Sequence, residues 1–403
     1  MKKEITTILA FLLLISICLS GCMKPQPDND YEPVNTTNDE EKNDATGGVN
    51  TDTHIPSDSS YSIDLIIKDN HQIHASVYAP DLNECPSYRL EPIQFDPKVA
   101  VRILLPDDNS TYTIEYDDKR NQTVLSTESG NILYARSISL MYMRDDTESN
   151  KFDAIGDLLT RYAEAHPEKQ TDSLDFMTMD DAILMAEKML KDLGICWQPV
   201  LQTSMGMDHQ KMMQYQQELY AADKNLEYKT YDPFGKVYVL ENLTEADDAY
   251  ILRFGFMYND LPIFGFDNEP SVQFQDGVLP PSQSYAEIII TRDGVRYFDM
   301  IGGYRIVETY ESKPILSAED AVEKYKEKWD MTLMPMPEDN WRVPLLYLEY
   351  LPITTDDGKV LIPYWCFARE AELTNTKTGE KFWTALGGIR LNAFTGEEHA
   401  YGG

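Results

Sequence analysis

The chain has 403 residues, with 35 Lys and Arg against 68 Asp and Glu, which gives a formal net charge of −33. Its 42% hydrophobic and 11% aromatic residues are enough for a folded core, so the composition excludes a wholly disordered polymer. The acidity argues against nucleic acid as a partner, because phosphate backbones are bound through clustered Lys and Arg. Only one stretch is apolar enough to enter a bilayer, which excludes a multi-span membrane protein.

That apolar stretch lies within residues 1–21 and has the pattern of a secretory signal. Two lysines precede an almost continuous apolar run over residues 8–19, which is too short to cross a membrane as a helix. We therefore expect residues 1–21 to be removed during export and the mature chain to be extracytoplasmic.

The signal ends in Leu19-Ser20-Gly21-Cys22, which resembles the lipobox of bacterial lipoproteins. In that motif the small residues give the peptidase access to the backbone, and the cysteine thiol takes the lipid. The resemblance implies cleavage before Cys22 and a diacylglycerol-type lipid on its sulfur, with no other cofactor. The expected location is the outer face of the cell membrane, where this lipid is the anchor.

Residues 22–60 are rich in Asn, Asp, Glu, Thr and Pro and carry few apolar side chains. Such a segment cannot bury enough surface to offset the entropy of ordering it. It is therefore predicted to be a disordered acidic tether between the lipid and the folded part.

The cysteines beyond the tether are Cys85, Cys196 and Cys366. Three cysteines allow at most one disulfide, and no Cys-x-x-Cys pair is present. The apolar neighbours of Cys196 and Cys366 favour buried, inert thiols. The sequence does not decide whether a disulfide forms.

Residues 61–145 form a region that is predicted to be rich in strands. Alternating or continuous apolar runs separated by turn residues indicate strands over 62–68, 74–78, 99–105, 111–116 and 132–135. The prolines that lie between the first of these runs suit irregular or edge segments.

Two amphipathic helices are predicted further along the chain, over residues 178–194 and 317–329. Each begins at a hydroxyl residue followed by acids, and the first ends at Gly194. Each helix is followed by two hairpins. The repeated order predicts an α+β fold, with antiparallel sheets and helices packed on one face, in two related units over residues 146–312 and 313–403.

The second of these units resembles a PepSY-type domain and the halves of the YycH/YycI regulatory proteins. The first unit, with Asn259-Asp-Leu-Pro-Ile-Phe-Gly and Thr291-Arg-Asp-Gly-Val, is similar to the same pattern but matches it more loosely. The resemblance rests on the capped helix at Ser317-Ala-Glu-Asp-Ala, the strand Leu361-Ile-Pro-Tyr-Trp-Cys-Phe and the final turn Leu391-Asn-Ala-Phe-Thr-Gly-Glu. It implies a non-enzymatic extracytoplasmic module that contacts another envelope protein, such as a sensor or a peptidase. YycH and YycI are held by a transmembrane helix, whereas this chain has a lipobox, so the resemblance does not identify a particular sensor.

An alternative function is solute or metal binding by the lipoprotein. Met205, Met207 and His209 offer two thioethers and an imidazole within five residues, and such ligands suit copper outside the cytoplasm. The same segment continues with apolar residues at helical spacing, which is also what a helix packed on the core would show.

Aromatic residues near the C-terminus suggest a further site. Tyr364, Trp365 and Phe367 could line a groove for a peptide or a glycan, although residues of this kind also fill the cores of small sheets. A carboxylate-dependent envelope hydrolase is the enzymatic alternative, because paired acids need not be neighbours in sequence. The oligomeric state is left open.

Overall fold

The fold is taken from a computed structural model, which describes residues 61–68, 70–106, 110–144, 173–222, 230–231, 237–238, 243–263, 284–331, 340–356, 358–374, 379 and 381–399. The predicted signal, lipidation site and tether lie outside these residues. Within the described ranges, no helix is long and apolar enough to cross a membrane.

Strands make up most of the elements. The first half contains β1 (Tyr61–Lys68), β2 (His71–Tyr78), β3 (Glu84–Cys85), β4 (Tyr88–Pro92), α2 (Pro97–Leu104), β5 (Tyr112–Asp117), β6 (Gln122–Thr127), β7 (Asn131–Arg136), β8 (Ser139–Arg144), β9 (Ser173–Leu174), β10 (Met177–Thr178), α4 (Met179–Asp192), β11 (Gln198–Met207) and α5 (His209–Ala222). The second half contains β12 (Thr230–Tyr231), β13 (Val237–Tyr238), the 3-10 helix η3 (Glu245–Asp247), β14 (Ala249–Tyr258), β15 (Leu261–Ile263), β16 (Tyr285–Thr291), β17 (Gly294–Ile301), β18 (Tyr304–Thr309), β19 (Lys313–Pro314), α6 (Ala318–Met331), β20 (Trp341–Thr355), β21 (Gly358–Thr374) and β22 (Lys381–Asn392).

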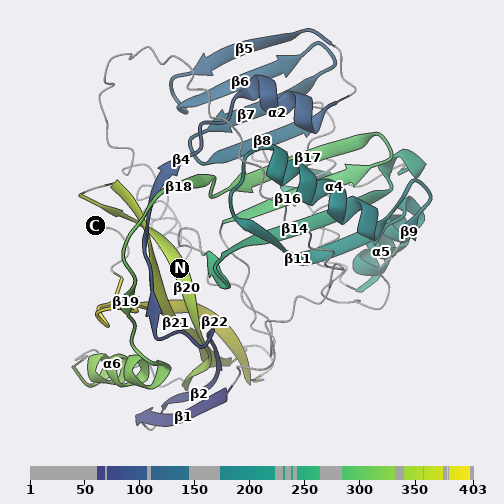
Figure 1. Cartoon of the computed structure of the whole chain (residues 1–403). Helices are drawn as coiled ribbons and strands as arrows, with labels where there is room; N and C mark the ends of the chain where they lie inside the picture. Colours follow the sequence, from purple (N-terminus) through teal and green to yellow (C-terminus); the bar gives the residue numbers. More distant parts are fainter. Residues whose placement is uncertain are drawn as a thin grey trace, which may run out of the picture. The chain divides into compact units, whose positions relative to one another are not determined.

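One sheet of 16 strands organises these elements (Figure 1). Its main path follows the order β18-β4-β21-β20-β15-β14-β16-β17-β8-β7-β6-β5, and β1, β2, β11 and β22 pair with strands on or beside that path. The pairs β2–β20 and β15–β20 are parallel, whereas the other pairs in this sheet are antiparallel. The sheet is therefore mixed.

This architecture corrects the predicted fold class. We expected α+β units of antiparallel sheet with helices packed on one face, but the described residues form a sheet-dominated fold with one large mixed sheet and four α-helices. The helices have 8 or 14 residues, whereas β20 and β21 have 15 and 17. The prediction gave the helices too much weight, because a capped amphipathic helix leaves a clearer sequence pattern than a strand buried on both faces.

The two predicted helices are confirmed as elements. Thr178 caps α4 by accepting a hydrogen bond from the Asp181 amide at 3.2 Å, and Ser317 caps α6 by accepting one from the Asp320 amide at 3.1 Å. Gly194 follows α4 with φ +83°, a backbone angle that glycine adopts without steric strain. The apolar side of α4 is buried through Ala182, Ile183, Ala186, Met189 and Leu190.

The strand predicted over residues 99–105 is wrong, because that run forms α2. Asp96 accepts a hydrogen bond from the Lys98 amide at 2.8 Å, and Pro97 occupies the first turn, where a missing N–H is tolerated. The buried side chains follow helical spacing, at Ala100, Val101 and Leu104, while Val99 is 39% exposed.

The predicted hairpin turns are confirmed where the structure describes them. Asn259 and Asp260 have φ +47° and +61° between β14 and β15, the conformation of a tight two-residue turn. β16 and β17 close with Thr291 opposite Gly294, and β20 and β21 close with Thr355 opposite Gly358. Turn residues are therefore reliable markers in this chain.

Strands from all three predicted segments, 61–145, 146–312 and 313–403, share the large sheet. β4 pairs with both β18 and β21, β8 pairs with β17, and β2 pairs with β20. The described residues between 61 and 399 accordingly belong to one compact unit.

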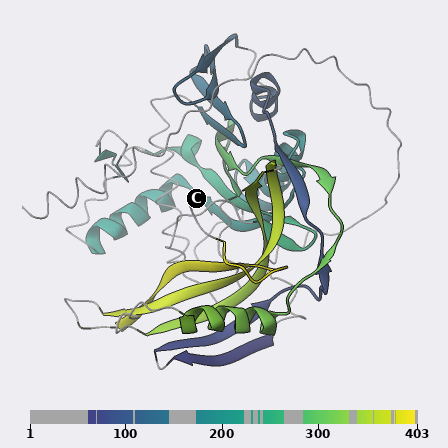
Figure 2. The same ribbon diagram turned by 90° about the vertical axis from the view of Figure 1, so that its left-hand side faces the viewer.

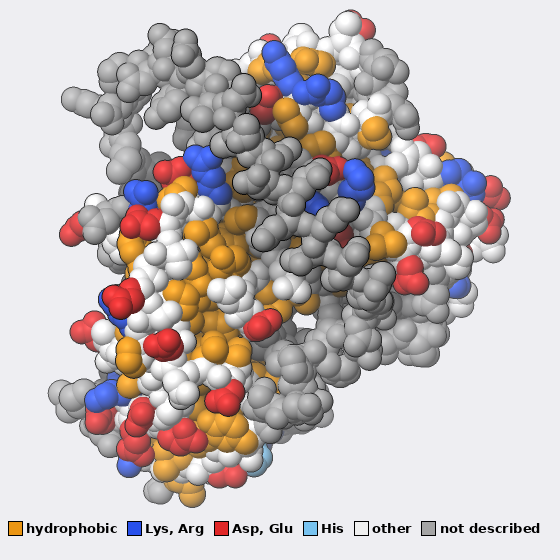
Figure 3. Space-filling view, in the orientation of Figure 1, with side chains coloured by type: hydrophobic (Ala, Val, Ile, Leu, Met, Phe, Trp, Pro, Cys, Tyr) orange, Lys and Arg blue, Asp and Glu red, His pale blue; other side chains and the backbone are white. Residues whose placement is uncertain are grey.

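Helix α6 lies alongside β1 and β2 in both ribbon views (Figures 1 and 2). The buried His71 of β2 links them, because its Nε2 is 3.1 Å from the Tyr325 hydroxyl and its ring is 4.8 Å from that of Trp329. On the face drawn in Figure 3, the Asp and Glu side chains lie closest together at the lower left, around α6, and are more widely spaced elsewhere on the described part of that face.

Candidate functional site

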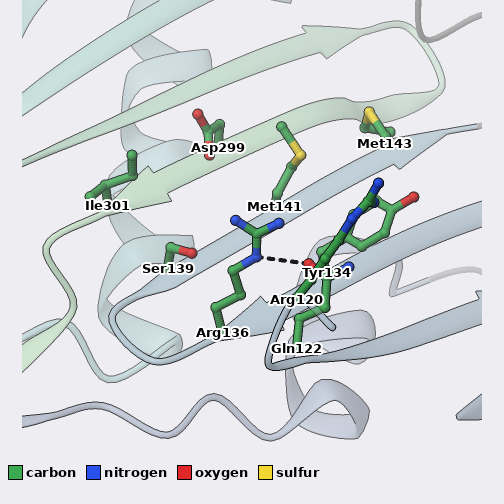
Figure 4. Close-up of a pocket in the computed structure, with 9 residues that line it drawn as sticks. All are labelled: Arg120, Gln122, Tyr134, Arg136, Ser139, Met141, Met143, Asp299 and Ile301. Atoms are coloured by element: carbon green, nitrogen blue, oxygen red, sulfur yellow. Dashed lines mark hydrogen bonds between the residues drawn. The ribbon is translucent and has the colours of Figure 1, made fainter. Parts of the chain in front are cut away.

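A pocket of about 390 Å³ lies on one face of β7, β8 and β17, beside the turn between β5 and β6 (Figure 4). Strand register brings its residues together: Tyr134 stands opposite Met141, which stands opposite Asp299. The intervening residues of these strands, including Leu133, Leu140 and Phe298, point to the other face and join the main core. The pocket lining consists of Arg120, Gln122, Tyr134, Arg136, Ser139, Met141, Met143, Asp299 and Ile301.

Two arginines enter this pocket from neighbouring hairpins. Arg120 lies in the β5–β6 turn, where the Asp117 carboxylate accepts its amide hydrogen bond at 3.3 Å, and its guanidinium Nε is 3.9 Å from the same carboxylate. Arg136 ends β7, and its Nε donates to the Gln122 side-chain oxygen at 2.7 Å. Gln122 is only 1% exposed and donates in turn to Asp117 at 3.4 Å. A buried amide therefore fixes the Arg136 guanidinium.

Asp299 supplies the carboxyl group of the pocket. The Tyr285 hydroxyl donates to its Oδ2 at 2.7 Å, and the Arg253 guanidinium lies 4.8 Å from the centre of the Tyr285 ring. Burial raises the pKa of Asp299, while the Tyr285 hydrogen bond and the charges of Arg253 and Arg136 act in the opposite direction. Burial and the Asp299 charge also raise the pKa of Tyr285.

The pocket combines charge with an apolar floor. Figure 4 shows the Arg136 guanidinium directed into the pocket towards Met141, with Asp299 on the strand beyond. Met141, Met143 and Ile301 contribute apolar surface from β8 and β17. Such a lining suits a ligand that has both an anionic group and an apolar part.

The predicted copper ligands lie elsewhere, at the junction of β11 and α5. Met205 and Met207 are 2% and 1% exposed and point to the same face of β11. His209 begins α5, and its Nδ1 is 2.8 Å from the Asp248 carboxylate, which also accepts the His209 amide hydrogen bond. Among the described residues, no group of three or more His, Cys, Asp or Glu side chains is placed to hold a metal ion.

The predicted aromatic groove at Tyr364, Trp365 and Phe367 is wrong. The three side chains are 4%, 3% and 0% exposed, and alternation along β21 places Tyr364 on the face opposite the other two. Phe367 stacks on Tyr325 with ring centres 4.4 Å apart, and the Trp365 indole donates to the Leu316 carbonyl at 3.0 Å. These aromatics are core residues.

A buried ion pair lies on the Tyr364 face of the same strands. Arg390 of β22 donates through Nε to Glu349 of β20 at 2.6 Å, and the two side chains are 4% and 0% exposed. Burial raises the pKa of Glu349, and Arg390 partly opposes that shift. Both side chains are shielded from solvent, so we regard the pair as structural.

The three cysteines in the described part are free thiols, with Cys85 and Cys366 buried. Cys196 is exposed, contrary to the prediction, and its thiol donates to the Tyr304 carbonyl at 3.1 Å. Its tryptophan neighbour Trp197 points to the core instead, because successive residues in an extended segment face opposite ways.

The sequence reasoning missed the pocket entirely. Its residues come from 120–143 and 299–301, and they carry no short motif. The available signal was the two-residue spacing of Tyr134 with Arg136 and of Met141 with Met143, which marks one face of each strand. Strand pairing between the distant segments was needed to bring those faces together.

Comparisons with known proteins add a fold likeness. No protein-family model matches the chain, and no curated protein matches it. The fold is similar to that of the crystal structure of an uncharacterised protein from Eubacterium rectale ATCC 33656, with a TM-score of 0.51 and 15% sequence identity over 85% of this chain and 94% of that one. At this identity the likeness concerns the fold alone.

Proposed function

We propose that the chain is a lipid-anchored extracytoplasmic binding protein that engages another envelope protein and does not catalyse a reaction. The observation that carries the proposal is the pocket with Arg120 and Arg136, in which a buried glutamine orients one guanidinium before any ligand arrives. A guanidinium held in this way is preorganised for binding.

The groups that line the pocket favour recognition over proton-transfer chemistry. Arginine stays protonated at physiological pH, so neither guanidinium can serve as a general base. The Asp299 carboxylate already accepts the Tyr285 hydroxyl. These properties support a binding role.

The lipobox-like Leu19-Ser20-Gly21-Cys22 supports attachment to the outer face of the membrane. The resemblance to PepSY and YycH/YycI proteins supports a regulatory partner in the envelope, such as a sensor or a peptidase. The membrane anchor and the regulatory partner are both part of the proposal. The partner must lie where a lipid-tethered protein can reach it.

Chemical crosslinking in intact cells, followed by capture of the full-length chain from membranes, tests this function. We expect a discrete envelope protein to be captured with the wild type and to be lost with Arg136→Gln. Arg102→Gln is the matched control, because Arg102 is exposed on α2, on the other side of the same strands. Capture of no specific protein, or of the same protein by both variants, would overturn the proposal for this pocket.

A further inference from the structure

The charge of the pocket differs from the charge of the chain. Two guanidinium groups, from Arg120 and Arg136, and one carboxyl group, from Asp299, line it. The Asp117 carboxylate lies 3.9 Å from the Arg120 guanidinium, so Arg136 is the cation that can meet a charged ligand. The whole chain carries a formal net charge of −33, which disfavours anions in general. A single guanidinium directed into the pocket matches a ligand group with a single negative charge.

The geometry at Arg136 narrows the chemistry of that group. Its Nε is occupied by Gln122, which leaves the edge formed by the two terminal nitrogens directed into the pocket (Figure 4). Two parallel N–H groups on one edge fit the two oxygens of a carboxylate. The Ser139 hydroxyl, which also lines the pocket, can donate a further hydrogen bond.

The remainder of the lining describes what the carboxylate is attached to. Met141, Met143 and Ile301 present apolar side chains, and thioethers adapt to differently shaped apolar groups. A volume of about 390 Å³ is within the range of small-ligand sites, and it admits one or two amino-acid residues but not a folded surface.

Taking the proposed binding function as given, we infer that the pocket binds a carboxylate carried by an apolar group, with Arg136 as the bidentate partner and Gln122 as its positioning residue. The same chemistry occurs at the free C-terminus of a peptide that ends in an apolar residue and in a small apolar carboxylic acid. The peptide C-terminus is the source that a protein partner would supply.

Titration of the full chain with a fluorescent Ala-Ala-Leu-Leu peptide tests the inference. We expect the free acid to bind at least about tenfold more tightly than the C-terminal amide, because only the carboxylate can accept a bidentate charged hydrogen-bond pair. Arg136→Lys should remove most of this preference while keeping the charge, and Arg102→Gln should keep it. Equal binding of the acid and the amide would overturn the inference.

Gln122 is buried, so its variant needs a folding control. Gln122→Glu keeps the side-chain shape, and thermal melting of each variant shows whether the fold is retained. Where Gln122→Glu melts early, Arg136→Lys alone decides the inference, because Arg136 is exposed. An unchanged acid-over-amide preference in a folded Arg136→Lys chain would contradict it.

Competition with N-acetyl-leucine distinguishes the two sources of the carboxylate. Stronger binding of the peptide supports a peptide C-terminus, whereas equal displacement supports a small apolar acid, and carboxylate recognition holds in either case. Acid-selective binding without any captured envelope protein would overturn the proposed partner but not this inference. Capture of an envelope protein that depends on Arg136, without tighter binding of the acid than of the amide, would overturn this inference but not the proposed partner.

Discussion

At the scale of single residues, Asp299 should make ligand binding depend on pH. Burial raises its pKa above the ordinary value for aspartate. As the pH falls from neutral through this raised pKa, protonation of Asp299 removes a negative charge from the pocket, so the affinity for a monoanionic peptide should rise. The peptide carboxylate, with an ordinary pKa of about 3.5, stays ionised over this range.

The Asp299→Asn variant is the control for this pH dependence. It lacks the titrating charge, so it should bind the same peptide more tightly than the wild type at about pH 7 and should show a flatter pH profile. Dissociation constants measured by fluorescence polarisation across this range check both expectations. A wild-type affinity that falls with acidification would contradict the assignment of Asp299.

Gly302 is a second position where one residue decides local structure. Its φ is +97°, and a Cβ atom added there would lie 2.5 Å from the Ser284 hydroxyl oxygen and 3.2 Å from the Ser284 Cα. Gly302→Ala should therefore lower the free energy of unfolding by about 1–3 kcal/mol, through backbone strain and this clash. Urea denaturation measures the change. Gly294→Ala is the control, because Gly294 also has a positive φ but has open space around the added Cβ atom. Its loss of stability therefore measures the backbone strain without the clash.

At the scale of elements, loss of one partner of the ion pair between β20 and β22 should destabilise the fold much more than replacement of both partners. Arg390→Leu leaves the buried Glu349 carboxyl without its partner and should lower the free energy of unfolding by about 3–5 kcal/mol near neutral pH. Replacing both residues with Leu should recover much of that loss. Urea denaturation of the two variants checks this. An Arg390→Leu variant that is as stable as the wild type would contradict this expectation.

The way in which the stability loss of Arg390→Leu changes with pH follows from the raised pKa of Glu349. Because burial raises its folded-state pKa, the folded chain binds the Glu349 proton more tightly than the unfolded chain does. The penalty is therefore present above the raised pKa and should shrink as the pH falls towards the unfolded value of about 4.3.

Elements with a local sequence pattern could be predicted, and the rest could not. Helix caps at Thr178 and Ser317 and the turn at Asn259-Asp260 are encoded within a few residues, and they are confirmed. Helix α2 was missed although Asp96-Pro97 is a helix-start signal, because its apolar run also fits a buried strand. The mixed sheet and the pocket depend on pairing between distant strands, such as β8 with β17, which no local pattern records.

At the scale of the whole molecule, the proposed lipid anchor makes location depend on one thiol. Cys22→Ala should move the chain from the membrane fraction to soluble or unprocessed pools, because the mature chain would lack the diacylglycerol group. Cell fractionation with metabolic lipid labelling measures both effects, and Cys18→Ala, within the predicted signal, is the matched control. Unchanged membrane retention and labelling in Cys22→Ala would remove the anchor from the proposal.

The pairing of β2 and β4 with β20 and β21 has a consequence for the order of folding. These partners are separated by more than half of the chain, so their pairings are strongly non-local and costly to form early. Under the proposed export, the N-terminal strands would emerge first, and they would lack their partners until β21 had crossed the membrane. A chain that stalls before this point presents unpaired strand edges, so a chaperone or a fast late translocation step would protect it from aggregation and proteolysis.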